Sequence, residues 1–138
     1  MDKALNYLAL AKKGRLVELG EEPVGAITRA VKGRLVVVAS DASDHTWRRA
    51  KSFVAGTSQQ CIRVPFSKEE LGLAVGRTSL AIAAFTDAPL ALAFVKALPD
   101  QEKVQAVAAE LEELSSRLKK RQSEAKAHQR NVRMGKKK

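Results

Sequence analysis

Residues 35–39, Leu-Val-Val-Val-Ala, form an unbroken apolar run of strand length. A strand with one face in water alternates polar and apolar residues, so a run without alternation has to be covered on both faces. The polar loop of residues 40–43, Ser-Asp-Ala-Ser, follows, and its side chains are of the kind that cap helices. We therefore expect residues 35–39 to be an interior strand of a sheet that is buried on both sides.

Helix-like and strand-like segments alternate around this run, which predicts an α/β layer fold. Residues 67–70, Ser-Lys-Glu-Glu, form a capping box, in which Ser67 and Glu70 satisfy each other's backbone amides at a helix start. Gly14 is expected to stop the first helix. The expected helices cover residues 5–13, 21–31, 44–54, 68–75 and 90–98, with a last one from 101, and the expected strands cover 15–19, 35–39, 61–64 and 80–86.

The composition indicates one domain with an aliphatic core. The chain has 138 residues, of which 45% are hydrophobic but only 4% aromatic. Its single cysteine, Cys61, allows no internal disulfide, and with only His45 and His128 there is no His/Cys set for a metal. Cys61 lies in an apolar stretch and is interpreted as a small buried hydrophobic residue. We expect no metal and no other cofactor.

Positive charge is concentrated at the C-terminal end. Lys and Arg number 25 against 15 Asp and Glu, which gives a net charge of +10. Residues 117–138 contain ten Lys or Arg and one acid, Glu124, a net of +9, so residues 1–116 carry 15 minus 14, or +1. Such a basic segment favours a polyanionic partner. The first residues have no apolar leader and no segment is apolar enough to span a membrane, so we expect a cytoplasmic protein with no membrane partner.

The sequence contains no arrangement typical of catalysis. Ser40, Asp41, Ser43 and His45 lie close together, but no nucleophile elbow accompanies them, and Ser and Asp before a helix are ordinary capping residues. The glycines at 72 and 76 lack a phosphate-loop context. We therefore expect no enzyme and no small-molecule substrate. Residues 45–49, His-Thr-Trp-Arg-Arg, mix aromatic and basic groups as nucleic-acid surfaces do, but a solvent-exposed helix face with Trp47 partly packed is favoured.

Apolar residues recur at spacings of three and four from residue 101 onward, which predicts a helix with one apolar seam. We define the seam as Val104, Val107, Leu111, Leu114 and Leu118. Burial of this seam against the domain is one interpretation, and a surface for a coiled coil or a protein partner is the other. The chain is thus divided into a domain (1–98), an amphipathic helix (99–121) and a basic tail (122–138) that is expected to be disordered.

Four stretches carry a family resemblance: residues 8–17 (LALAKKGRLV), 20–22 (GEE), 35–43 (LVVVASDAS) and 64–72 (VPFSKEELG). In this order and spacing they resemble the kink-turn-binding ribosomal-protein superfamily, which includes the archaeal L-seven-Ae and eukaryotic L-thirty-e proteins. The resemblance covers roughly residues 1–98 and is closest to the bacterial YlxQ branch. It implies a three-layer α/β/α sandwich with a four-stranded mixed sheet, and a non-catalytic, ribosome-associated role in binding structured RNA of the kink-turn kind.

The resemblance also implies where RNA binds. In the family, RNA is held by the N-terminus of the second helix and by the loop before the last strand, where backbone N–H groups and the helix dipole suit phosphate. Basic residues near the same edge of the sheet are expected to neutralise further phosphates. The residues so assigned are Gly20, Glu21 and Glu22 in the first place, Arg77, Thr78 and Ser79 in the second, and Lys12, Lys13 and Arg15 at the edge.

The helix-two motif departs from the archaeal pattern G-x-N-E-x-T-K. Glu22 stands where the family has Asn, Pro23 where it has Glu, and Ala26 where it has Lys. Arg29, one helical turn beyond Ala26, is the residue that replaces the missing lysine on that face. Two functions of different class follow. The first is an RNA-binding protein whose tail adds non-specific affinity; the second is an assembly factor that has lost kink-turn specificity and docks a protein partner through the seam.

Overall fold

The computed structural model describes the backbone of residues 2–135 and the side chains of residues 2–118. Its centre is a four-stranded sheet in the order β1-β4-β2-β3. The strands are β1 (Val17–Leu19), β2 (Leu35–Val38), β3 (Gln60–Arg63) and β4 (Ile82–Phe85). Strand β4 runs antiparallel to β1 and β2, whereas β2 and β3 are parallel, so the sheet is mixed as expected.

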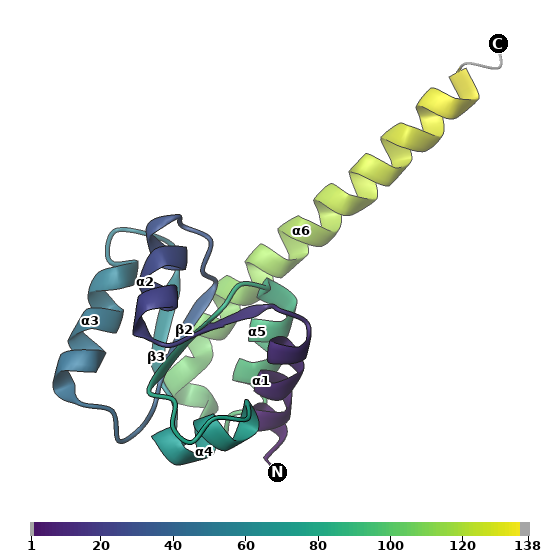
Figure 1. The fold of residues 1–138 in the computed structure, drawn as a ribbon. Helices are drawn as coiled ribbons and strands as arrows, with labels where there is room; N and C mark the ends of the chain where they lie inside the picture. Colours follow the sequence, from purple (N-terminus) through teal and green to yellow (C-terminus); the bar gives the residue numbers. More distant parts are fainter. Residues whose placement is uncertain (1, 136–138) are drawn as a thin grey trace.

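Helices cover both faces of this sheet, which confirms the three-layer architecture (Figure 1). The layer of α2 and α3 packs on Val36 and Val38, and the layer of α1, α4, α5 and α6 packs on Leu35 and Val37. Side chains of successive residues in a strand point to opposite faces, so the run at 35–38 feeds two cores at once. The helices are α1 (Lys3–Lys13), α2 (Glu21–Arg29), α3 (Asp44–Val54), α4 (Lys68–Ala74), α5 (Ala88–Lys96) and α6 (Gln101–Gly135).

The helix ends agree with the capping chemistry except at the C-terminus of α2. The Ser67 and Glu70 side chains form the expected capping box, and Ser43 caps α3. Helix α1 ends at Lys13 with Gly14 as its C-cap, as expected, and the left-handed residue Arg15, with φ 58°, follows it. Helix α2, however, ends at Arg29, earlier than the expected 31, because Val31 turns left-handed with φ 55°. Hydrogen bonds from Leu16 N–H to the Ala11 carbonyl and from Lys32 N–H to the Ile27 carbonyl close the two ends.

The first half of α6 belongs to the core of the domain. Val104 and Leu111 are 6% and 1% exposed and lie in the same apolar cluster as Phe94 of α5. Val107 also packs against this cluster. The seam from 104 to 111 is therefore buried against the domain, and the surface that a protein partner would need along it is already covered.

Helix α6 also extends beyond the expected boundary at residue 121. Its backbone is helical through Gly135, and its outer half projects from the domain (Figure 1). The physical reason is composition, because residues 101–134 contain no Gly or Pro and are rich in Ala, Glu, Gln, Lys and Arg, which favour helix. The side chains from residue 119 onward, and residues 136–138 altogether, lie outside the described residues. The role of the basic tail therefore stays a prediction.

Leu111→Ala should lower the free energy of unfolding by about 2–5 kcal/mol, because it removes a fully buried side chain from the contact between α6 and the domain. Urea unfolding of the full chain measures the effect. The matched control is Gln105→Ala, which changes an exposed position of the same helix and should leave stability within about 0.5 kcal/mol. A Leu111 variant as stable as the control would mean that α6 is not part of the core.

Candidate nucleic-acid interface

Helix α2 begins at the end of the edge strand β1 without a capping side chain. Gly20 occupies the N-cap position with φ 97°, a backbone conformation that favours glycine. The Gly20 N–H donates to the Ile82 carbonyl at 3.0 Å, which fixes the helix start beside the first residue of β4. The first N–H groups of a helix have no partner within it, so those of Glu21 and Glu22 are available at the positive end of the dipole.

The loop before β4 is held against helix α4. The Arg77 N–H donates to the Gly72 carbonyl at 2.8 Å, and the Leu80 N–H donates to the Lys68 carbonyl at 2.9 Å. This packing leaves the side chains of Arg77, Thr78 and Ser79 exposed. The loop thus presents one guanidinium and two hydroxyl groups. Its hydrogen bonds to α4 hold its backbone in place.

These two segments meet in space. The Arg77 Nη1 lies 3.9 Å from the position that a Cβ atom on Gly20 would occupy. A side chain at position 20 would therefore contact the Arg77 guanidinium, and it would also strain the backbone. The structure brings together the helix-two start and the loop before the last strand, the two places where the family resemblance puts RNA.

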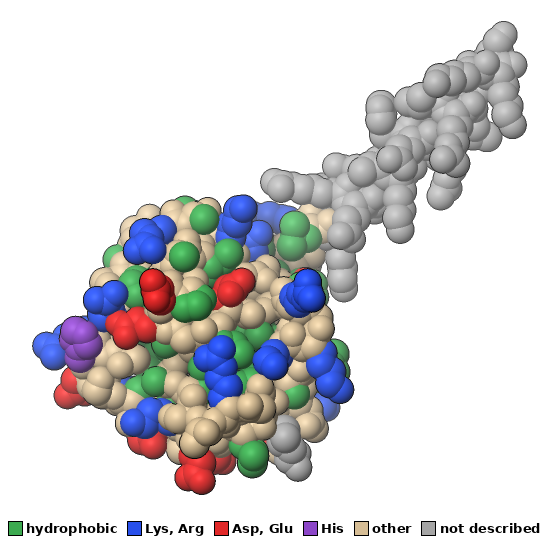
Figure 2. Space-filling view, in the orientation of Figure 1, with side chains coloured by type: hydrophobic (Ala, Val, Ile, Leu, Met, Phe, Trp, Pro, Cys, Tyr) green, Lys and Arg blue, Asp and Glu red, His purple; other side chains and the backbone are tan. Residues whose placement is uncertain are grey.

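Glu21, Glu22 and Arg29 face helix α3 across a polar groove. The Glu21 carboxylate forms an ion pair with Arg49 of α3. Glu22 and Arg29 line the groove, whose volume is about 550 Å³, together with His45 of α3. Pairing with Arg49 offsets the negative charge of Glu21 at the start of α2. Figure 2 shows the result on one side of the molecule, where basic and acidic side chains are interspersed.

Lys12, Lys13 and Arg15 are not brought to this site. The Gly20 N–H bonds to Ile82 at the start of β4, whereas the Leu16 carbonyl accepts from Thr86 just after its end. Arg15 and Gly20 are five residue steps apart along the chain, which in extended conformation is roughly 16 Å. The three basic residues do lie by the edge strand, as expected, but at its opposite end, because α1 and β1 run in opposite directions and meet there (Figure 1).

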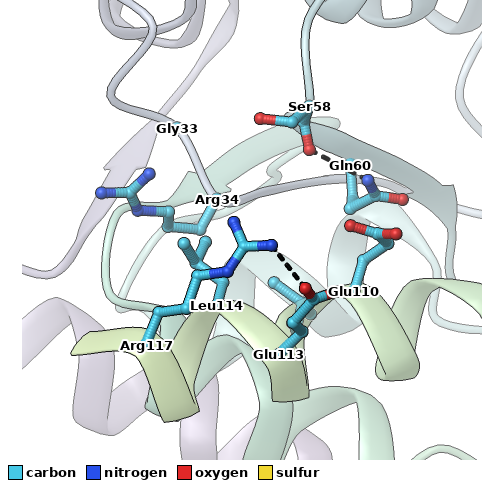
Figure 3. Close-up of a pocket in the computed structure, with 9 residues that line it drawn as sticks. Gly33, Arg34, Ser58, Gln60, Glu110, Glu113, Leu114 and Arg117 are labelled. Atoms are coloured by element: carbon cyan, nitrogen blue, oxygen red, sulfur yellow. Dashed lines mark hydrogen bonds and ion pairs between the residues drawn. The ribbon is translucent and has the colours of Figure 1, made fainter. Parts of the chain in front are cut away.

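A second, smaller cavity lies where α6 crosses the starts of β2 and β3 (Figure 3). It encloses about 60 Å³, room for one or two solvent molecules. Arg34 and Arg117 line it with Glu110 and Glu113, and Arg117 is paired with Glu113. The Arg34 Nε is buried without a hydrogen-bond partner among the described residues. Two positive and two negative side chains leave this cavity without net charge, so it does not favour an anion.

The polar residues that sequence analysis considered for catalysis have structural roles. The Asp41 carboxylate accepts from the Lys68 N–H at 2.8 Å, and the Ser43 hydroxyl accepts from the Thr46 N–H at 3.1 Å. Burial raises the pKa of Cys61 to about 12, and nearby Lys51 lowers it only in part. A thiol with this pKa stays protonated near neutral pH, in agreement with the interpretation of Cys61 as a small hydrophobic residue.

Among the described residues, no three His, Cys, Asp or Glu side chains are grouped to hold a metal ion. Over the same part of the chain, no helix combines the length and the apolar character that a membrane span requires.

Two solved structures share this fold. A protein of unknown function from Bacillus halodurans matches with a TM-score of 0.62 and 23% sequence identity, over 81% of this chain and 99% of its own. The 15.5 kD RNA-binding protein of Giardia lamblia matches with a TM-score of 0.60 and 17% identity, over 76% of this chain and 87% of its own. At these identities the likeness establishes the fold alone. Neither a protein-family model nor a curated protein matches the sequence.

Sequence analysis did not identify Gly72 as part of the site. A Cβ at this position would lie 2.7 Å from the backbone nitrogen of Ser79 and 2.9 Å from the carbonyl oxygen of Arg77. Only a residue without a side chain lets the loop approach α4 this closely. A usable signal was present, because a glycine inside a helix is costly and often marks close packing.

Gly72→Ala should displace the loop at 76–79 and lower the free energy of unfolding by about 1–3 kcal/mol, since the atoms in its way belong to the backbone. Amide hydrogen exchange at Arg77 and Leu80 reports the displacement, because both hydrogen bonds to α4 would open. Gly14→Ala is the control, since its Cβ would lie 3.4 Å or more from its neighbours at an ordinary φ of −84°. Equal exchange in the two variants would contradict the role assigned to Gly72.

The half-buried thiol should make stability depend on pH in alkaline solution. Because folding raises the pKa of Cys61 from 9.0 to about 12, its contribution to the free energy of unfolding is complete below pH 9 and is lost as pH rises toward 12. The measurement is the difference in unfolding free energy between wild type and Cys61→Ala from pH 7 to 11, in which other titrating groups cancel. A difference that stays constant with pH would contradict the assigned burial.

Proposed function

We propose that this protein is a non-catalytic RNA-binding protein that recognises structured RNA, of the kink-turn kind, through the start of α2 and the loop at 76–79. The observation that carries the proposal is that the Arg77 Nη1 lies 3.9 Å from the position a Cβ on Gly20 would occupy. It gives one compact surface from two segments that are more than fifty residues apart in the sequence. The fold that the chain shares with the Giardia lamblia RNA-binding protein supports the same class of partner.

Each part of this surface has a chemical role toward RNA. The N–H groups of Glu21 and Glu22 and the Arg77 guanidinium bind phosphate oxygens. Gly20 lets the RNA backbone approach closely because it has no side chain. The hydroxyl groups of Thr78 and Ser79 act as donors and acceptors toward base edges or 2′-hydroxyl groups. Arg29 adds positive charge at the far end of the α2–α3 groove.

The basic tail supplies affinity without sequence preference. Lys and Arg side chains of the tail, together with those at 119–121 just before it, neutralise phosphates and release counterions, which makes binding depend strongly on salt. The proposed setting is the cytoplasm, with ribosomal or other kink-turn RNA as the partner.

Arg77→Gln should weaken binding of the full chain to a kink-turn RNA by about 1–3 kcal/mol, or roughly 5- to 150-fold, and should affect a plain duplex less. The measurement is a titration of both RNAs, of equal length, over a salt series. Lys32→Gln is the matched control, because it removes the same charge from an exposed position beyond the other end of α2.

A second variant tests the contribution of this positive charge. In it, the nine Lys and Arg after residue 118 are replaced by Gln in the full chain. It should weaken binding to both RNAs alike and flatten the salt dependence. The full length is kept because α6 contributes to the core. The proposal is overturned if the wild-type chain shows no preference for the kink-turn RNA and Arg77→Gln behaves as Lys32→Gln does.

A further inference from the structure

Helix α3 and the edge strand β3 carry an aromatic and basic group of residues that the proposed site does not use. We define the Trp47 cluster as Trp47, Lys51 and Arg63. The Arg63 guanidinium carbon lies 5.1 Å from the Trp47 ring centroid, and the Lys51 Nζ lies 5.3 Å from it. Both distances are within the range of cation–π attraction.

Both cations of this cluster are held in place and yet exposed. Trp47 is half-buried and packs against the core that α3 and α2 share, so its ring is a fixed support. Arg63 also donates a long hydrogen bond, 3.4 Å, to the Ala42 carbonyl. Lys51 and Arg63 are both exposed, and neither forms an ion pair with any residue whose side chain the structure describes.

The strand register places the Trp47 cluster at the same end of the sheet as the proposed RNA site. Gly20 bonds to Ile82, Ile82 is opposite Val38, and Val38 is opposite Arg63. These four residues form one row across the sheet, and three strand spacings separate its two ends, which is roughly 14 Å. Because α2 and α3 lie on the same face, the start of α2 and the Trp47 cluster also belong to one layer (Figure 1).

We propose that the Trp47 cluster is a second RNA contact, in which Lys51 and Arg63 bind phosphates of the same RNA that α2 and Arg77 hold. This inference rests on the proposed function. The chemistry that supports it is preorganisation, since a cation already held on an aromatic face loses less side-chain freedom when a phosphate binds. The acidic side chains of Glu21 and Glu22 line the groove between α2 and α3, so the RNA contacts the start of α2 and the Trp47 cluster as two separate points.

The test compares three variants of the full chain with the Lys32→Gln control in the RNA titration. Arg63→Gln and Lys51→Gln should each weaken binding about threefold to tenfold and reduce the salt slope by about one. Trp47→Leu keeps both charges, and it should weaken binding about twofold to fivefold because the cations lose their support. Thermal unfolding shows whether each variant is folded. If Trp47→Leu is not folded, the binding of Arg63→Gln alone decides whether the Trp47 cluster contacts RNA.

The outcomes separate this inference from the proposed function. If Arg77→Gln weakens binding while Arg63→Gln and Lys51→Gln bind as the Lys32→Gln control does, the Trp47 cluster is no RNA contact, and the inference is overturned while the proposed function stands. If the wild-type chain binds no RNA, both are overturned. A Trp47→Leu variant that is folded but binds as wild type does would overturn the role of the ring as support.

Discussion

The arrangement of the site depends on the antiparallel pairing of β2 and β4 at the centre of the sheet. All eight residues of these strands are buried, and each strand contributes side chains to both cores. Ala83 and Ala84 have small side chains, which pack beside large ones such as Leu35 of β2 and Phe85 of the same strand. The register of this pair puts the start of α2, the loop before β4 and the end of β3 at one end of the sheet. The polar surface is thus a product of apolar packing.

The sequence predicted the order and type of every helix and strand, because each signal was local. The run at 35–39 and the capping box at Ser67 each act within a few residues. The end of α2 was misplaced by two residues, since the left-handed turn at Val31 depends on the hydrogen bond from Lys32 to Ile27. Such a helix end is set by the folded chain and not by residue preference alone.

The candidate site was predictable only in part, for a different reason. Its two segments came from the family resemblance, but their contact and the need for Gly72 depend on residues that are distant in sequence. The opposite placement of Lys12, Lys13 and Arg15 follows from the direction of β1, which no residue pattern encodes. Buried Gln59 is a similar case: its side chain joins the Gly33 N–H to the Thr28 carbonyl, and no local signal announces it.

Helix α6 begins near Arg63, at the end of the sheet that carries the interface, and passes Arg34 at the other end before it projects outward. The positive charge after residue 118 therefore starts at least one strand length from Gly20. Electrostatic attraction in physiological salt is screened over about 8 Å, which is shorter than this separation. In the proposed function, the tail and the interface would therefore act on RNA as electrostatically independent contacts. A protein built in this way would change its overall affinity for RNA through the tail without altering what the domain selects.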